Sequence, residues 1–173
     1  LTVLRDISFT LHEGEIVAIL GRSGAGKSTF LRILAGLVPA SSGTVTYRGT
    51  DITGPNPGVG LVFQTFALMP WLTVQANVEL GLEARGVPRE ERRRAALQAI
   101  DAIGLDGFEN AYPKELSGGM RQRVGIARAL VVQPDALFMD EPFSALDVLT
   151  AENLRNEVLK MWSGNQRSIK SVL

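Results

Sequence analysis

The chain has no cysteine among its 173 residues, which excludes a disulfide framework and any thiolate metal site. It also lacks an excess of charge, because lysine plus arginine and aspartate plus glutamate both number 18. This balance argues against binding nucleic acid through bulk electrostatics, and we expect no nucleic-acid partner. No apolar run approaches the ~20 residues that a membrane-spanning helix needs. What remains, 45% hydrophobic and 21% charged residues, is typical of one compact globular domain.

Neither end of the sequence resembles a natural terminus. The first residue is leucine rather than methionine, and residues 1–6 lack the basic and apolar regions of a signal peptide. The last residues, 168–173, are typical of the first half of a buried strand. We therefore expect the sequence to be a fragment of a longer protein.

Strand and helix patterns alternate along the chain. Short β-rich apolar runs predict strands at residues 15–20, 44–47, 59–63, 136–140 and 168–173. Helical patterns predict helices at residues 27–35, within 73–104, and at 117–131 and 147–162. Such alternation indicates an α/β fold with a mainly parallel sheet flanked by helices. We expect one domain, with a core from residues 1–70 and 134–173 and an inserted helical subdomain at residues 71–133.

The helical insertion contains a run of mixed charge, residues 89–94, at the start of its second helix. Farther along, Leu97, Ile100 and Ile103 fall on one side of that helix, with Gly104. We interpret the charged run as a solvated helix face rather than a binding patch.

A complete phosphate-loop pattern, GxxxxGK[ST], lies between the first predicted strand and the first predicted helix. Glycines let backbone N–H groups approach phosphate oxygens, where a Cβ would collide. The helix that follows presents unpaired N–H groups and its positive dipole end to the same anion. We expect Lys27 to contact the β- and γ-phosphates and Ser28 to ligate Mg²⁺. The predicted nucleotide-binding residues here are Gly21, Arg22, Ser23, Gly24, Ala25, Gly26, Lys27, Ser28 and Thr29.

The apolar strand predicted from residue 136 ends in two carboxylates, Asp140 and Glu141. A strand that is buried on both faces is expected to be apolar throughout. Ligands bind at the carboxyl ends of parallel strands, so Asp140 should meet the phosphate loop and support Mg²⁺. Glu141 could orient or deprotonate the attacking water.

A third motif begins at Ser117, about twenty residues before the acidic strand. Ser117 can cap the next helix, and Gly118 and Gly119 leave its N–H groups exposed, which makes a second anion site. One nucleotide does not need two such helix ends from one subunit. The stretch Leu116-Ser117-Gly118-Gly119-Met120-Arg121-Gln122-Arg123 resembles the signature motif of ATP-binding cassette (ABC) proteins. The resemblance implies that Ser117 to Gly119 face the γ-phosphate held by a second cassette, in a head-to-tail dimer with two shared ATP sites.

Two more residues match the family in order. Gln64 resembles the family glutamine that contacts Mg²⁺ and the attacking water, and Asp147 resembles the key carboxylate of the loop that crosses the dimer interface. The resemblance therefore implies a P-loop ATPase fold, ATP and Mg²⁺ as cofactors, and Glu141, Gln64 and Lys27 as catalytic residues. The sequence departs from the family pattern in two places. The family's switch histidine and adenine-stacking aromatic would fall outside this sequence, and we expect the single histidine, His12, to occupy an exposed turn.

Residues 64–74, with their Pro-Trp-Leu-Thr-Val stretch, and residues 141–147 look like cassettes of nitrate, sulfonate and bicarbonate importers. This resemblance implies an ATP-hydrolysing subunit at the cytoplasmic face of the inner membrane. Its partners would be a transmembrane permease, a second cassette and, indirectly, a solute-binding protein. The apolar residues 66–71 could line a groove for the permease or belong to the core of the helical lobe. Two other functions remain open: a soluble cassette ATPase that is not linked to transport, and a nucleotide-binding fragment that does not hydrolyse ATP.

Overall fold

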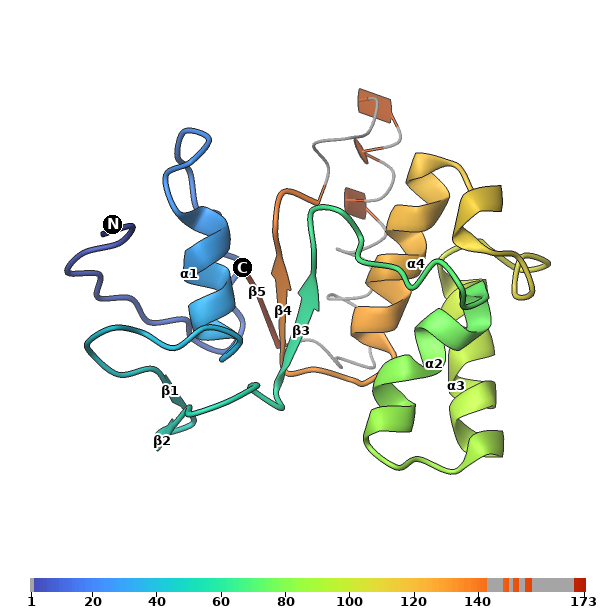
Figure 1. The fold of residues 1–173 in the computed structure, drawn as a ribbon, viewed down its shortest axis with the longest axis horizontal. Helices are drawn as coiled ribbons and strands as arrows, with labels where there is room; N and C mark the ends of the chain where they lie inside the picture. Colours follow the sequence, from blue (N-terminus) through green and yellow to red (C-terminus); the bar gives the residue numbers. More distant parts are fainter. Residues whose placement is uncertain (1, 143–147, 150, 153–154, 157–169) are drawn as a thin grey trace.

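The computed structural model describes residues 2–142, 148–149, 151–152, 155–156 and 170–173 (Figure 1). In chain order its elements are α1 (Lys27–Leu34), β1 (Thr46–Tyr47), β2 (Thr50–Asp51), β3 (Val59–Val62), α2 (Val74–Ala84), α3 (Arg89–Ala102), the 3₁₀ turn η1 (Pro113–Glu115), α4 (Gly118–Leu130), β4 (Ala136–Met139) and β5 (Ser171–Val172). Among these residues no helix is both long and apolar enough to cross a membrane.

The main sheet has the order β3-β4-β5, and both of its pairings are parallel. The register pairs Val62 with Met139, so β3 and β4 end at the same edge of the sheet. Parallel neighbours bring segments far apart in sequence to one edge, where α/β folds bind ligands. The predicted α/β class with a mainly parallel sheet is confirmed.

Alternate residues of β4 face two different helices, as expected for a strand buried on both faces. Leu137 belongs to a buried cluster with Ile126 and Ala129 of α4. Phe138 belongs to another cluster, with Leu31 of α1. The sheet is therefore enclosed between α1 and α4, which lie on opposite sides of it in Figure 1.

A third cluster lies among α2, α3 and α4 and is built on residues that are almost fully buried, including Val78, Ile100, Ile103 and Val124. The predicted apolar side of α3 is thus confirmed at Ile100 and Ile103. The charged run 89–94 is exposed except at Arg92, as predicted for a solvated face. Arg92 instead forms ion pairs with the α2 carboxylates of Glu79 and Glu83, at 3.1 and 3.2 Å.

The prediction of a strand at residues 15–20 was wrong in extent. Only Ile16 forms a β-bridge, parallel to Val172, and the Val17 N–H donates to the Val172 carbonyl at 2.9 Å. The physical reason is that a strand needs a partner, and β5 is two residues long. The predicted helix 147–162 lies largely outside the described residues, as do residues 168–169 of the last predicted strand.

The sequence predicted a strand that includes β1, but it predicted neither β2 nor the hairpin that the two strands form. Its two connecting residues, Arg48 and Gly49, both have left-handed backbones, with φ of 50° and 77°. That conformation matches the twist of a tight two-residue hairpin turn. The sequence signal is weak because arginine is an unusual residue at a left-handed position.

Candidate functional site

The phosphate-loop segment passes directly into α1, as predicted. Gly24 and Gly26 have φ of 79° and 91°, a conformation that residues with a Cβ rarely adopt. A Cβ added at Gly26 would lie 2.8 Å from Leu4 Cδ2, so the Leu4 side chain would have to shift to admit it. No side chain caps α1, and its first turn holds no acidic residue. Its N-terminal N–H groups and positive dipole end therefore suit an anion.

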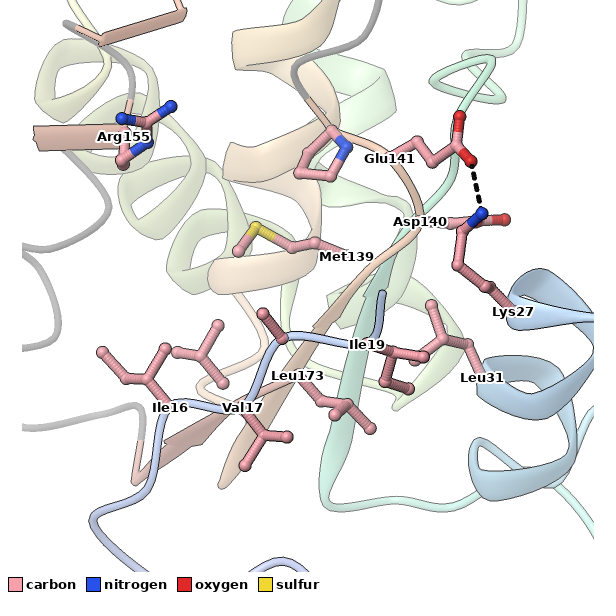
Figure 2. A pocket seen from close by; sticks show the side chains of 13 residues that line it. Ile16, Val17, Ile19, Lys27, Leu31, Met139, Asp140, Glu141, Arg155 and Leu173 are labelled. Carbon is pink, nitrogen blue, oxygen red and sulfur yellow. Dashed lines mark ion pairs between the residues drawn. The ribbon is translucent and has the colours of Figure 1, made fainter. Parts of the chain in front are cut away.

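Lys27 lies at the centre of the site. Its Nζ donates to the carbonyl oxygens of Gly21 and Arg22, at 2.9 and 3.3 Å. It also forms an ion pair with Glu141 Oε1 at 3.2 Å, drawn as the dashed line in Figure 2. Only 18% of the Lys27 side chain is exposed. The ammonium group is thus held between the phosphate loop and the end of β4.

Ser28 and Asp140 form the second contact between these two segments. The Ser28 hydroxyl donates to Asp140 Oδ1 at 2.8 Å. Asp140 is only 4% exposed, and its backbone N–H donates to the Val62 carbonyl at 3.0 Å, which fixes it to β3. A hydroxyl and a carboxylate are hard oxygen donors of the kind that Mg²⁺ prefers, usually together with substrate phosphates. The pair therefore fits the predicted cation.

Gln64 and Glu141 meet at the shared edge of the sheet. Each lies two residues beyond the paired Val62 and Met139, and the Gln64 amide Nε2 donates to Glu141 Oε2 at 3.2 Å. Glu141 has φ of 48°, in the left-handed region, and it precedes a proline. Strained backbone of this kind costs about 1–3 kcal/mol and concentrates at functional sites. The structure thus brings together four side chains predicted for the site around Lys27.

A cavity of about 410 Å³ adjoins this cluster (Figure 2). Residues 16–19, α1 and the ends of β4 and β5 line it, and most of the lining side chains are apolar. Its charged lining residues are Lys27, Asp140, Glu141 and Arg155. An apolar wall beside charged groups reduces the local dielectric, which strengthens their attraction for an ion or a phosphate.

The third predicted motif lies elsewhere. Ser117 is the N-cap of α4, and its Oγ accepts a hydrogen bond from the Met120 N–H at 3.2 Å. Gly118 and Gly119 begin the helix, whose first turn has no acidic residue. In Figure 1 both α1 and α4 begin at the end of the molecule where β3 and β4 end, but on opposite sides of the sheet. The structure does not bring Ser117 to the phosphate loop.

Two further predictions concern residues away from this cluster. Asp147, with residues 143–146, lies outside the described part of the chain. His12 is exposed beside a turn, and its carbonyl accepts the Glu15 N–H, so the predicted turn position is confirmed.

Sequence reasoning missed two polar side chains that fix the backbone after Gln64. Asn77 is fully buried, and its amide makes four hydrogen bonds to backbone groups of Met69, Leu72 and Thr73. Arg128 donates to backbone carbonyls of residues 66 and 67. The available signal was the placement of a polar residue on an otherwise apolar helix face, which requires a buried partner.

Comparison with known proteins gives one family and several relatives. A family model described as ABC transporter matches residues 4–144. The nitrate import ATP-binding protein NrtD of Synechocystis is 47% identical over 166 residues, which are 96% of this chain and 62% of the relative. The taurine import ATP-binding protein TauB of Yersinia pestis is 45% identical over 166 residues, 96% of this chain and 65% of the relative. The chain thus spans less than two thirds of the length of these relatives.

Among solved structures, the ATP-binding cassette MJ0796 matches with a TM-score of 0.82 and 34% identity. The match covers 98% of this chain and 78% of that chain. That structure is a dimer in a post-hydrolysis state, bound to ADP and Pi.

Proposed function

The chain belongs to the ABC transporter family, and from that membership we propose that it is the ATP-binding and ATP-hydrolysing part of a subunit that powers solute uptake. The observation that carries the proposal is the cluster in which Glu141 contacts both Lys27 and Gln64, and Ser28 contacts Asp140. These side chains come from three segments of the chain, and each has the chemistry that transfer of a phosphoryl group to water requires.

Binding of ATP would use the phosphate loop, Gly21 to Thr29. The N–H groups at the start of α1 would donate to phosphate oxygens, and Lys27 would exchange part of its contact with Glu141 for the β- and γ-phosphates. Ser28, Asp140 and Gln64 would hold Mg²⁺. When bound there, Mg²⁺ would neutralise charge on the phosphates.

In the hydrolysis step, Glu141 would accept a proton from a water molecule that Gln64 helps to orient. The water oxygen forms a bond to the γ-phosphorus while the bond from that phosphorus to the β,γ-bridging oxygen breaks, and ADP leaves with the electron pair. The left-handed backbone of Glu141 and its hydrogen bond from Gln64 support this role, because both fix the carboxylate before substrate arrives.

A second cassette would complete each ATP site. We propose that Ser117, Gly118 and Gly119 of one subunit face the γ-phosphate bound by the other, with Asp147 at the interface. The position of α4 across the sheet from α1 supports this arrangement, since the sheet lies between the two helices of one chain. We also propose residues 71–133 as a helical subdomain, supported by the separate buried cluster of α2, α3 and α4.

The permease would contact the segment that follows Gln64, at the cytoplasmic face of the membrane. Trp71, a large apolar residue that is 69% exposed, would take part in this contact. The solute would be a small anion such as nitrate, a sulfonate such as taurine, or bicarbonate, delivered to the permease by a solute-binding protein. The nitrate and taurine relatives are similarly close in identity, which fits a solute that never touches this chain.

The test is phosphate release from Mg·ATP by the parent protein and by its Glu141→Gln variant, measured on this chain and on the full-length protein that contains it. We expect the variant to bind Mg·ATP with unchanged affinity but to turn over about 10²–10⁴-fold more slowly, the usual scale for a positioned general base. Equal turnover in both proteins would overturn the role of Glu141. Binding without turnover in either full-length protein would favour a nucleotide-binding module that does not hydrolyse ATP.

A further inference from the structure

Arg128, on the last turn of α4, holds the backbone just beyond Gln64. Its Nη1 donates to the Ala67 carbonyl and its Nη2 donates to the Phe66 carbonyl, each at 2.7 Å. The two donors belong to one planar guanidinium, so the contact fixes both position and orientation. Short bonds from a charged donor are stronger than those between neutral groups.

The backbone at these two residues is strained. Phe66 and Ala67 have φ of 62° and 46°, in the left-handed region that favours glycine. Each such residue costs about 1–2 kcal/mol, and two in succession persist only where other contacts hold them. The hydrogen bonds from Arg128 supply that hold.

Among the described residues, no carboxylate pairs with the Arg128 guanidinium, and its hydrogen bonds go to the two carbonyl oxygens. Burial lowers the pKa of the guanidinium, since the group is partly removed from water. A partly buried cation that is compensated by two carbonyl oxygens is costly to move. The contact therefore resists displacement of the turn from α4.

The same turn contains Gln64. The Phe66 N–H donates to the Phe63 carbonyl at 3.0 Å, which closes a four-residue turn with Gln64 as its second residue. Gly125, one turn of α4 before Arg128, faces Phe66: a Cβ there would lie 3.7 Å from Phe66 Cβ and from its carbonyl oxygen. Helix α4 therefore supports this turn from behind, while the Gln64 amide contacts Glu141 in front.

We propose that Arg128 is a positioning residue for hydrolysis, which acts by fixing the turn of residues 63–67 so that Gln64 stays against Glu141. Arg128 lies on the last turn of the helix that Ser117 caps, so one helix carries both the signature residues and the contact that fixes the turn. This inference rests on the proposed ATPase function. Arg128 does not touch the nucleotide site itself.

The first experiment compares Arg128→Lys with its parent in the full-length protein. Lysine keeps the charge but cannot donate to both carbonyls from a planar fork. We expect kcat to fall about 10–100-fold, the scale of a misplaced catalytic group, while the Kd for Mg·ATP changes less than about twofold. Arg123→Lys is the matched control, because Arg123 lies on the same helix but donates to the Ile103 carbonyl, far from the turn in sequence.

The second experiment repeats Arg128→Lys in a Gln64→Ala background. If Arg128 acts through Gln64, the substitution has little further effect on kcat once the amide is gone. Ala67→Gly should partly restore kcat in the Arg128→Lys protein, because glycine adopts the left-handed backbone without strain. If Arg128→Lys alone does not fold, the double variant Arg128→Lys/Ala67→Gly takes its place in the kcat comparison. Amide exchange of residues 64–68 should accelerate in Arg128→Lys and not in Arg123→Lys.

Several outcomes would overturn the inference. One is that Arg128→Lys and Gln64→Ala lower kcat independently, so that their fold-losses multiply in the double variant. Another is that the affinity for Mg·ATP falls as much as kcat does. A third is that amide exchange at residues 64–68 is unchanged in Arg128→Lys. If the parent shows Glu141-dependent turnover, each of these removes only the role of Arg128. A full-length parent without such turnover would overturn the proposed function and this inference with it.

Discussion

The Lys27 side chain connects two segments of the site, the phosphate loop and the residues that follow β4. Its ammonium has three oxygen partners, two carbonyls of the phosphate loop and the Glu141 carboxylate. Phosphate oxygens would thus replace partners already present rather than attract a bare charge. The net gain on binding is smaller than the isolated attraction, but the geometry is fixed in advance.

We predict that Lys27→Ala weakens binding of Mg·ATP about 10–100-fold. The variant would lose the hydrogen bonds from the Lys27 ammonium to the phosphates, which are worth about 1.5–3 kcal/mol because the donor is charged. Direct titration by calorimetry would measure it. Arg93→Ala, which removes an exposed cation of α3, is the control and should leave the affinity unchanged. An unaltered Kd in the Lys27 variant would contradict the proposed contact with the phosphates.

At the scale of elements, α1 depends on how it ends as much as on how it begins. Gly36, just beyond the helix, has φ of 70°, and its N–H donates to the Ile33 carbonyl at 3.0 Å. The backbone of residues 54–56 passes directly over this end, and the Asn56 N–H donates to the Ala35 carbonyl at 2.9 Å. The predicted helix end at Gly36 is confirmed, but the crossing backbone could not be anticipated.

Gly36→Ala is expected to destabilise the fold strongly. A Cβ there would lie 1.8 Å from the Gly54 carbonyl oxygen, so backbone must move in addition to the left-handed strain. The comparison is Gly14→Ala, where φ is 90° and the space is open, so that only the conformational cost of about 1–2 kcal/mol applies. Urea denaturation should show the larger loss at Gly36. Equal losses of unfolding free energy in the two variants would mean that the backbone of residues 54–56 moves aside at little cost.

The hairpin of β1 and β2 is fastened to the start of β4 through Asp135. A hydrogen bond from Tyr47, and then the charges of Arg48 and Lys170, hold the pKa of Asp135 below its ordinary value. A depressed folded-state pKa gives stability that is present above the unfolded pKa of about 4 and is lost as pH falls through the folded value.

Asp135→Asn should therefore lower the free energy of unfolding near pH 7 by up to about 1 kcal/mol, the scale of exposed ion pairs. The difference from the parent should narrow as pH falls below about 4, where Asp135 itself becomes protonated. Thermal unfolding across that range would measure the trend. A difference that stays constant with pH would show that the carboxylate charge contributes nothing.

At the scale of the whole molecule, the two helix ends suited to anions lie on opposite sides of one sheet. Leu137 and Phe138, adjacent in β4, face α4 and α1 respectively, so the sheet itself separates the two sites. In the proposed dimer, a second copy or a similar cassette would bring a helix end such as that of Ser117 to a phosphate bound at Lys27.

We predict that Gly119→Phe in the full-length protein abolishes dimerisation that depends on ATP. A bulky side chain at the start of α4 would occupy the space that the partner's γ-phosphate needs. Sedimentation velocity with and without Mg·ATP would measure the dimer, and Arg93→Phe, on the exposed face of α3, would control for added bulk elsewhere. A dimer that persists in the Gly119 variant would count against the shared site.

The family and much of the site could be predicted because their signals are local. Glycines at 24 and 26, a lysine at the helix start and two carboxylates after an apolar strand each have a chemical meaning within a few residues. The strand at residues 15–20 could not be predicted in extent, because a strand depends on its partner and β5 pairs with only part of that segment. The role expected of Asp147 stays a prediction.

The sequence by itself determined which residue types are present and in what order: the phosphate loop, the acidic strand end and the capped helix at Ser117. Only the tertiary structure decided their contacts. Gln64 meets Glu141 across 77 residues because β3 and β4 pair in parallel and in one register, and Ser28 meets Asp140 across 112 because α1 packs against β4. No local pattern encodes that register, which is set by burial of the strand faces against α1 and α4. The hold of Arg128 on the strained turn is of the same kind, since it exists only once α4 lies behind β3.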